Sequence, residues 1–516
     1  MHLYKLIIYL LYLVVYSNGY EILAVFPHSA RSHHIYFSAL VEELALRQHN
    51  VTVINYHPVQ KIPTLRQISL QNKENASACV DIEKRMEVLS VSDFALAYAT
   101  AKVFKNIANT NCKKLMNHRE VQELIESSSH FDLVIVEQFV TDCGLAVAYK
   151  LNAPAIGIAA HILSPWTYPR LGAPNNPAYV PNHFFGSGSK PTLWNKIKSL
   201  VINLGMNMYY THVIQRSDQE IVNEVYPDTP LLEELGKNMS LILINQYFPL
   251  TGPRLYSSNV VEVGGLHINL NDHVAEDEGL LNFLDSASNG VVYISFGSVA
   301  SNFPRKISNE IMKLVEKSNM RFVWKTDISD WVPPSNVLIG KWMPQTAVLC
   351  HPNVVGFISH SGMLSTSEAM HCGVPLVSVP LFGEQFANGR SAVESGLGVL
   401  LDVLTLNVHV LEDALKTILQ EQYQKKAKTL SKLWKDRPLS PMETAIFWIE
   451  YVARNKEAVN LKPPTLDMPL YQYLMIDVLL VMALATLVIG YIIVKLISLV
   501  FIIVFEDHKL KGKKVE

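Results

Sequence analysis

The chain has 516 residues, which is too long for one ordinary hydrophobic core, so two large domains are expected. Its formal net charge of −2 gives no overall basic field that would attract nucleic acid, and a nucleic-acid partner is not expected. Hydrophobic residues make up 49% of the chain, and the longest apolar runs lie near its two ends, which indicates membrane targeting.

Residues 1–19 are predicted to form a cleaved signal peptide. Lys5 precedes an apolar run from Leu6 to Tyr16, and small residues stand three and one positions before Tyr20. The run is too short to span a bilayer. The alternative is a buried first strand, but the following segment fits that role better.

The next part of the chain, residues 20–255, is predicted to be an α/β domain. Short apolar runs separated by helical stretches are typical of a buried parallel sheet. A helix is expected over Tyr36–Arg47, and a Pro-, Asn- and Gly-rich loop over Pro165–Pro191, which precedes an amphipathic stretch. Long irregular insertions of this kind often bind ligands. The expected strands are Glu21–Phe26, Asn50–Asn55, Phe131–Glu137 and Ala155–Ile158.

A second α/β domain is expected over residues 256–440, followed by a returning helix and linker over 441–470. A helix at Glu443–Arg454 precedes the pair Pro463–Pro464. The chain carries no G-x-G-x-x-G fingerprint, which argues against a dinucleotide-dependent oxidoreductase. The strands expected in this domain are Val291–Ser295, Arg321–Lys325, Val337–Lys341 and Val355–Ser359.

Residues 475–505 are predicted to cross a membrane. Val478–Val494 contains no charged residue, and the apolar run continues beyond Lys495. The tail, residues 506–516, is rich in lysine and is expected on the cytoplasmic side, with Lys513 and Lys514 as a dilysine-like retrieval signal. This arrangement predicts a single-pass type I protein of the endoplasmic reticulum membrane, with the bulk of the chain luminal.

Secretory modifications are expected but not fixed by the sequence. Asn75 and Asn238 begin plausible N-glycan acceptor motifs. Of the five cysteines, Cys79 and Cys112 could pair, which would leave the other three as buried thiols. The odd number excludes complete pairing within the chain.

A run of 29 residues from Phe357 to Gln385 carries the strongest chemical signal. A short apolar strand ends in a His-Ser-Gly turn, and the following stretch has helical character. Such a turn directs backbone N–H groups and the positive end of a helix at one place, where an anion can bind. A hydroxyl suits a phosphate, and a carboxylate can accept from both hydroxyls of a vicinal diol. The residues concerned are His360, Gly362, Ser365, Glu368, Pro375, Pro380, Glu384 and Gln385.

This pattern resembles the donor-binding signature of the UDP-glycosyltransferase family, and the resemblance extends over essentially the whole chain. It implies the GT-B fold, in which two Rossmann-like domains face each other across a cleft. It also implies that His360, Gly362, Ser365 and Glu368 hold the UDP moiety and that the pair Glu384–Gln385 orients the sugar.

Further donor contacts follow from the same resemblance. Trp342 is expected to stack on uracil with Gln345 nearby, although a plain core role for this tryptophan is the alternative. Ser298, after a Phe-Gly pair, is expected near the diphosphate. The chain has no Asp-x-Asp motif, so no metal and no cofactor is expected, with the UDP-sugar as co-substrate.

The acceptor hydroxyl needs a base, and the resemblance places it at His33, just after the first strand. His34 and His28 are close, so the choice is not unique. A carboxylate should orient this base. The family has an aspartate at the end of the strand that here ends in Glu137, and Asp142 is the second candidate; Glu137 fits the register better.

The sequence therefore predicts an inverting transferase that moves a hexose, expected to be glucose, from a UDP-sugar to a hydroxyl of a small lipophilic acceptor. The wording Phe-Gly-Glu-Gln at the sugar site resembles invertebrate members, which mostly use UDP-glucose, although Arg390 leaves room for a carboxylate-bearing sugar. A membrane-lipid glycosyltransferase and a catalytically silent binder are the alternatives. The expected partners are the UDP-sugar, the acceptor and the membrane, with self-association left open.

Overall fold

A computed structural model describes most of the chain. The described residues are 19–71, 80–81, 87, 91–127, 129–268, 277–297, 300–301, 304–456 and 461–512. The signal-peptide prediction, Asn75, Cys79, Ser298 and the two lysines of the retrieval signal lie outside them. The chain divides into one compact unit over residues 1–463 and a second unit over residues 464–516.

The first half of the compact unit is built on a seven-stranded sheet in the order β3-β2-β1-β5-β6-β7-β8, and every pair of neighbouring strands is parallel. Its strands are β1 (Glu21–Val25), β2 (Asn50–Asn55), β3 (Leu65–Ser69), β5 (Leu133–Glu137), β6 (Ala155–Ala159), β7 (Ile242–Ile244) and β8 (Val260–Glu262).

Helices cover both faces of this sheet, as alternation along β1 shows. Ile22 and Ala24 pack into one apolar cluster with α2, whereas Leu23 and Val25 pack into another with α4 and α6. The helices of this half are α2 (Arg31–Leu46), α4 (Asp93–Met116), α5 (Arg119–Glu126), α6 (Cys143–Lys150), α7 (Thr167–Arg170), α8 (Leu193–Tyr209), a π-helix (Tyr210–Gln215), α9 (Arg216–Val225), α10 (Leu232–Lys237) and α11 (Phe248–Thr251).

The second half is built on a six-stranded parallel sheet in the order β12-β11-β9-β13-β14-β15. Its strands are β9 (Val291–Ser295), β11 (Arg321–Lys325), β12 (Val337–Gly340), β13 (Val354–Ser359), β14 (Leu376–Ser378) and β15 (Gly398–Leu400). Its helices are α12 (Glu278–Asp285), α13 (Arg305–Lys317), α14 (Gln345–Cys350), α15 (Met363–Cys372), α16 (Gln385–Ser395), α17 (Val408–Ile418) and α18 (Glu421–Lys435). A short parallel pair joins β4 (Val80–Asp81) to β10 (Ala300–Ser301).

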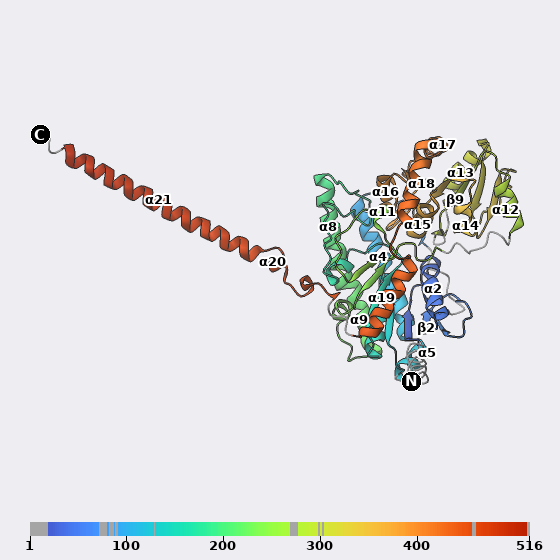
Figure 1. Cartoon of the computed structure of the whole chain (residues 1–516), viewed down its shortest axis with the longest axis horizontal. Helices are drawn as coiled ribbons and strands as arrows, with labels where there is room; N and C mark the ends of the chain where they lie inside the picture. The colour runs from blue at the N-terminus through green and yellow to red at the C-terminus, as the bar shows by residue number, and fades with distance from the viewer. Residues whose placement is uncertain are drawn as a thin grey trace, which may run out of the picture. The chain divides into compact units, whose positions relative to one another are not determined.

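The chain returns to the first half through α19 (Pro441–Asn455). Ala445, Ile446 and Ile449 of this helix belong to the same apolar cluster as α2 and β1, and Figure 1 shows α19 among the helices of the first half. Pro at the first helical position and a hydrogen bond from the Glu443 N–H to the Ser440 hydroxyl begin the helix. The prediction of two Rossmann-like halves and a returning helix is confirmed.

The second unit contains a 3₁₀ turn (Pro464–Leu466), α20 (Leu470–Tyr473) and α21 (Ile476–Gly512). Within α21, residues Ile476–Glu506 are long and apolar enough to cross a membrane, and this is the one such helix among the described residues. Length and composition are therefore consistent with the expected anchor.

Two details of the predicted fold are wrong. The helix expected from Tyr36 begins at Arg31, so His33 lies in a helical turn and not in a loop. The strand β8 belongs to the first sheet, so that sheet extends past the boundary expected at residue 255.

The cysteine prediction is also wrong, because Cys112 pairs with Cys143 and Cys350 pairs with Cys372. The first disulfide joins α4 to α6 in the core of the first half. The second joins the last residues of α14 and α15. Neither pairing is visible from spacing, because each depends on how helices pack.

Candidate active site

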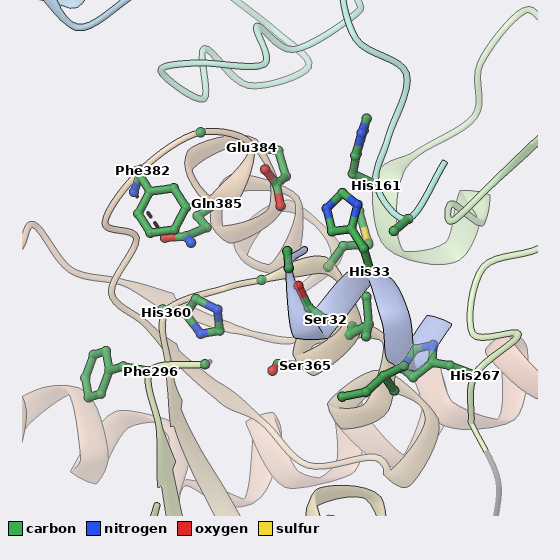
Figure 2. Close-up of a pocket in the computed structure, with 18 of the residues that line it drawn as sticks. Ser32, His33, His161, His267, Phe296, His360, Ser365, Phe382, Glu384 and Gln385 are labelled. Atoms are coloured by element: carbon green, nitrogen blue, oxygen red, sulfur yellow. Dashed lines mark hydrogen bonds between the residues drawn. The ribbon is translucent and has the colours of Figure 1, made fainter. Parts of the chain in front are cut away.

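A cavity of about 250 Å³ lies between the carboxyl-terminal edges of the two sheets (Figure 2). Ligands in open α/β sheets bind at this edge. Its two sides are called the first wall and the second wall according to the half of the chain that supplies them. The first wall includes His28, Ser32, His33, Thr100, Val103, Phe104, Ile107, Phe139 and His161, and the second wall includes Lys325, Trp342, Gln345, His360, Gly362, Ser365, Glu368, Phe382, Glu384 and Gln385.

On the first wall, the structure brings His33 and Glu137 into contact. His33 lies in the first turn of α2, and Glu137 ends β5, the strand paired with β1. The His33 Nδ1 atom lies 2.6 Å from Glu137 Oε1, and the His28 backbone N–H donates to Oε2 at 3.2 Å. With Nδ1 engaged by the carboxylate, Nε2 is left for the cavity that His33 lines.

Burial sets the protonation of this pair. It lowers the pKa of His33 to about 4, so the imidazole is neutral near pH 7 and can accept a proton. Burial also raises the pKa of Glu137 to about 7, while the N–H of His28 favours the charged carboxylate. A neutral imidazole whose Nδ1–H is held by a carboxylate has the arrangement of a general base.

Asp142, the second candidate for orienting the base, lies in a different network. Its carboxylate accepts from the Arg170 guanidinium, the Tyr210 hydroxyl and the Gln215 amide, each at 2.8 Å. Asp142 and Arg170 are both buried. These hydrogen bonds hold α6, α7 and the π-helix together. Of the two candidate carboxylates, only Glu137 contacts His33 in the described part of the structure.

His34 and His28, the two other candidates for the base, make contacts that differ from those of His33. His34 packs on His57, with ring centroids 5.1 Å apart, and is not among the described residues that line the cavity. His28 lies beside His33, with ring centroids 4.7 Å apart, and burial lowers its pKa to about 3. The His28 Nδ1 atom contacts the Asn111 amide at 3.3 Å, so its hydrogen bonding serves the core of the first half.

On the second wall, the turn before α15 is tightly packed around His360. A Cβ added at Gly297 or at Gly362 would lie 2.6 Å from His360 Nε2, so a side chain at either position would force the imidazole to move. Ser361, which follows His360 in the chain, has a φ of 64°, a left-handed conformation that is costly for a residue with a side chain. The turn directs the unpaired N–H groups at the start of α15 toward the cavity.

Glu368 belongs to a hydrogen-bonded set at the same site. Gln345 Nε2 donates to the Ser365 hydroxyl at 2.9 Å and also to Glu368 Oε2. His267 Nε2 lies 3.2 Å from Glu368 Oε1. The carboxylate is thus fixed by an amide and an imidazole before any ligand arrives, which is the preorganisation expected of a diol-binding group.

Trp342 makes a contact that the sequence did not suggest. The Arg31 guanidinium carbon lies 3.9 Å from the centre of the indole ring, and Lys325 Nζ lies 4.2 Å from it. The indole is 47% exposed, so it is not a plain core residue. Arg31 comes from α2, and this cation–π contact therefore joins the two halves across the mouth of the cavity.

Glu384 and Gln385 lie at the start of α16. The Gln385 side-chain oxygen accepts from the N–H groups of Leu381 and Phe382, at 2.8 and 3.1 Å, so its amide N–H₂ is the part left for a ligand. Burial raises the pKa of Glu384. Arg390, the candidate partner for a sugar carboxylate, pairs with Glu394 and is not among the described lining residues.

Sequence reasoning missed several lining residues. His161 follows β6 and Lys325 ends β11, so both could have been found from the rule that ligands bind where parallel strands end. His267 and the α4 residues, such as Phe104, follow no predicted strand, and no local pattern marks them.

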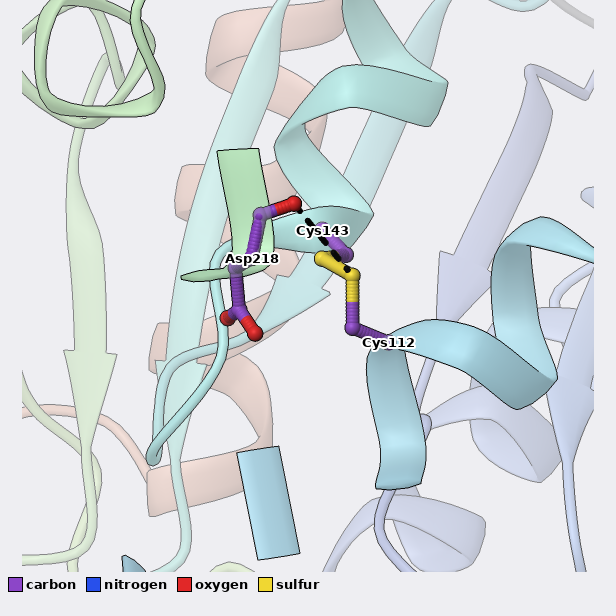
Figure 3. Close-up of side chains that lie close together, drawn as sticks. All are labelled: Cys112, Cys143 and Asp218. Atoms are coloured by element: carbon purple, nitrogen blue, oxygen red, sulfur yellow. Dashed lines mark hydrogen bonds between the residues drawn. A yellow bond between two sulfur atoms is a disulfide. The ribbon is translucent and has the colours of Figure 1, made fainter. Parts of the chain in front are cut away.

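One group of cysteine and aspartate side chains among the described residues resembles a metal site, but its sulfurs are not free to bind a metal ion. Cys112, Cys143 and Asp218 place one ligand atom each within 4.8 Å of one another (Figure 3). The two sulfurs are bonded to each other, so neither is a free thiolate. Asp218 instead accepts from the Thr141 hydroxyl at 2.7 Å, and burial raises the pKa of Asp218 to about 7.

Comparison with known proteins identifies the family to which this chain belongs. The family model described as "UDP-glucoronosyl and UDP-glucosyl transferase" matches residues 21–511. UDP-glucosyltransferase 2 of Dactylopius coccus is 32% identical over 492 residues, covering 92% of each protein. UDP-glucuronosyltransferase 1A10 of Homo sapiens is 29% identical over 462 residues, covering 87% of this chain and 86% of that protein.

A solved structure of a UDP-glucose:anthocyanidin 3-O-glucosyltransferase in complex with UDP has the same fold. Its TM-score is 0.57 at 19% identity, and the match covers 85% of this chain and 100% of that one. This likeness shows the GT-B fold. The chain therefore belongs to the UDP-glucuronosyl and UDP-glucosyl transferase family, and it is a glycosyltransferase that moves a sugar from a UDP-sugar to an acceptor.

Proposed function

We propose that this enzyme transfers glucose from UDP-glucose to a hydroxyl of a small lipophilic acceptor, with inversion at the anomeric carbon and His33 as general base. The observation that carries the proposal is the partly buried contact between His33 and Glu137, 2.6 Å long, on the wall that faces the start of α15. A silent binder would have no use for a neutral imidazole held in this way.

The proposed step is a single displacement. The acceptor oxygen forms a bond to C1 of the sugar while its proton passes to His33 Nε2, and the bond from C1 to the diphosphate oxygen breaks. Glu137 stabilises the imidazolium that results. The charge that develops on UDP is met by Ser365, His360 and the N–H groups of α15, and we propose that no divalent cation is required.

The distribution of positive charge in the cavity supports the choice of glucose. Lys325 is the one lysine or arginine among the described residues that line the cavity, and it lies on Trp342. Trp342 and Glu368 belong to the expected nucleoside end of the site, so the described lining residues offer no further lysine or arginine for the sugar end, which is expected beside Glu384. A sugar carboxylate would lack a counter-ion there.

The first wall supports a lipophilic acceptor. Beyond His33, the cavity is bounded by apolar side chains of α4 and by Phe139, whose ring centroid lies 5.0 Å from that of His33. Such a wall gains free energy from burying an apolar or aromatic acceptor, whereas it offers few partners to a polyol.

The test uses full-length enzyme in microsomes, a panel of UDP-sugars and a mixture of phenols and steroids, with products read by mass spectrometry. We expect hexosides from UDP-glucose in the presence of EDTA, and β-linked product by NMR from the α-linked donor. Preference for UDP-glucuronate would refute the sugar assignment. UDP binding without any product would indicate a silent binder.

We also propose that α21 anchors the enzyme in the endoplasmic reticulum with both halves luminal. The span Ile476–Glu506 and the lysine-rich tail support this orientation. Asn238 is exposed and available for glycan. Protease added to intact microsomes should remove the tail, while the glycosylated part stays protected; protection of the tail would reverse the topology.

A further inference from the structure

His161 is a buried histidine on the first wall, and the proposed mechanism does not use it. It follows β6 at the carboxyl-terminal edge of the sheet and is 4% exposed. It lines the same cavity as His33, and the two ring centroids are 6.0 Å apart (Figure 2).

The protonation of His161 is fixed by one hydrogen bond. Its Nδ1 atom lies 2.6 Å from the Ile162 carbonyl oxygen. Because a carbonyl oxygen can only accept, Nδ1 carries the hydrogen, and Nε2 of the neutral ring carries a lone pair. Burial lowers the pKa of His161 to about 4, so this neutral form holds near pH 7. Nε2 is buried and has no partner among the described residues.

A buried acceptor without a donor costs free energy, and such atoms at a cavity are commonly satisfied by a ligand. Here the missing partner is a donor, because Nε2 offers only a lone pair. A hydroxyl can supply it, whereas an ether, a carbonyl or a carboxylate cannot.

His33 presents the same chemistry beside it. Its Nδ1–H faces Glu137, so its Nε2 also carries a lone pair toward the cavity. Each hydrogen bond to such a nitrogen spans about 2.8 Å. Two hydroxyls of one small ligand can therefore reach both rings at the observed separation of 6.0 Å. Phe139 lies 5.0 Å from His33 and 5.2 Å from His161, centroid to centroid, and supplies an aromatic surface next to both.

We propose that His161 Nε2 accepts a hydrogen bond from a second hydroxyl of the acceptor, so that the cavity selects aromatic acceptors with hydroxyls on adjacent carbons. This inference rests on the proposed function for the role of the first hydroxyl, which His33 deprotonates. His161 is then a specificity-determining residue that binds the neighbouring, unreacting hydroxyl.

The test compares catechol, its monomethyl ether guaiacol, and phenol. Binding of each to the full-length, UDP-loaded enzyme is measured by calorimetry, and kcat/KM is measured with UDP-glucose. We expect catechol to bind about 3- to 10-fold more tightly than guaiacol or phenol, because it alone can donate to His33 and His161 at the same time. The preference should appear in the dissociation constant and in KM more than in kcat, because the second hydroxyl binds His161 but takes no part in the bond that forms.

Two variants isolate the nitrogen concerned. In His161→Asn the amide N–H can still donate to the Ile162 carbonyl, but nothing reaches the Nε2 position. In His161→Gln the longer amide can place its oxygen near that position. We expect the catechol preference to disappear in His161→Asn and to be largely kept in His161→Gln. Each ratio is taken within one variant, so a general loss of affinity or activity cancels.

Equal catechol preference in the wild type and His161→Asn would overturn the inference, as would a wild type that binds catechol and guaiacol alike. The proposed function fails separately. If catechol binding depends on His161 but no UDP-sugar gives product, the diol site stands and the transferase assignment falls. If phenols are glucosylated with no dependence on His161, the reverse holds.

Discussion

The two walls of the cavity present different polar groups: neutral imidazoles on the first wall and a hydrogen-bonded carboxylate on the second. On the first wall, the rings of His28, His33 and His161 lie beside Phe139, and burial lowers the pKa of each, so the wall presents neutral bases. On the second wall, Glu368 is hydrogen-bonded on both oxygens before a ligand is present. The first wall is suited to taking a proton from an apolar molecule, and the second to holding a charged and hydroxyl-rich one.

The difference predicts that substitutions on the first wall affect turnover, whereas those on the second wall affect donor binding. The largest effect should come from His33→Ala. Positioned proton transfer contributes about 10² to 10⁴ in rate, so kcat should fall by that factor while UDP affinity, measured by calorimetry, stays close to that of the wild type.

His34→Ala is the matched control, because His34 packs on His57 away from the cavity. It should keep most of the activity. Acidic acceptors such as nitrophenols should lose least in His33→Ala, because they need less help to release the proton. Near-normal activity of His33→Ala on an aliphatic alcohol would remove the proposed mechanism, even if donor binding remained intact.

The second-largest effect distinguishes the two carboxylates, Glu137 and Asp142, that the sequence offers as partners of His33. Asp142→Asn breaks a buried ion pair with Arg170, which typically costs about 3–5 kcal/mol, so the free energy of unfolding should drop by that order. Glu137→Gln should leave stability nearly unchanged and reduce kcat, because the orienting carboxylate is lost.

Denaturant unfolding and turnover per folded molecule distinguish these outcomes. If Asp142→Asn does not fold, Tyr210→Phe tests the same network more mildly, because it removes only one hydrogen bond to Asp142. A selective loss of kcat in Tyr210→Phe would show that this network also serves the base.

The third effect concerns the second wall. Glu368→Ala should weaken UDP binding by about 1.5–3 kcal/mol, because a charged acceptor for the ribose hydroxyls is lost. Glu421, whose side chain is 79% exposed on α18, provides the control, and Glu421→Ala should leave UDP affinity unchanged. Unchanged affinity in Glu368→Ala would mean that the signature holds the fold and not the donor.

The walls also differ in how far the sequence predicts them. The second wall follows largely from one contiguous motif, because a strand, a turn and a helix bring His360, Ser365 and Glu368 together without help from distant residues. Most strands were predicted within one or two residues, since buried parallel strands are continuous apolar runs. The strands β7, β8, β14 and β15 were missed, because three residues give too little pattern, and the longer β3 was missed as well.

The first wall is assembled from distant segments. Phe104, Phe139 and His161 meet only because α4 contacts the segments that follow β5 and β6, and no local spacing encodes that packing. The two disulfides depend on helix packing in the same way. The choice between Glu137 and Asp142 needed the structure as well, because both lie near the end of the same strand and only their partners distinguish them.

The smallest predicted effect tests whether the left-handed backbone of the turn before α15 lowers the free energy of unfolding. Ser361 has a φ of 64°, and its hydroxyl is buried without a partner among the described residues. Glycine adopts this conformation freely and removes the hydroxyl, so Ser361→Gly should raise the free energy of unfolding by about 1 kcal/mol. Ser367→Gly is the matched control, because Ser367 is also buried but lies inside α15, where replacing serine by glycine should destabilise by about 0.5 kcal/mol. Denaturant midpoints should therefore move in opposite directions for the same substitution six residues apart. A loss of stability in Ser361→Gly would show that the serine side chain stabilises the turn and that the left-handed backbone imposes no net cost there.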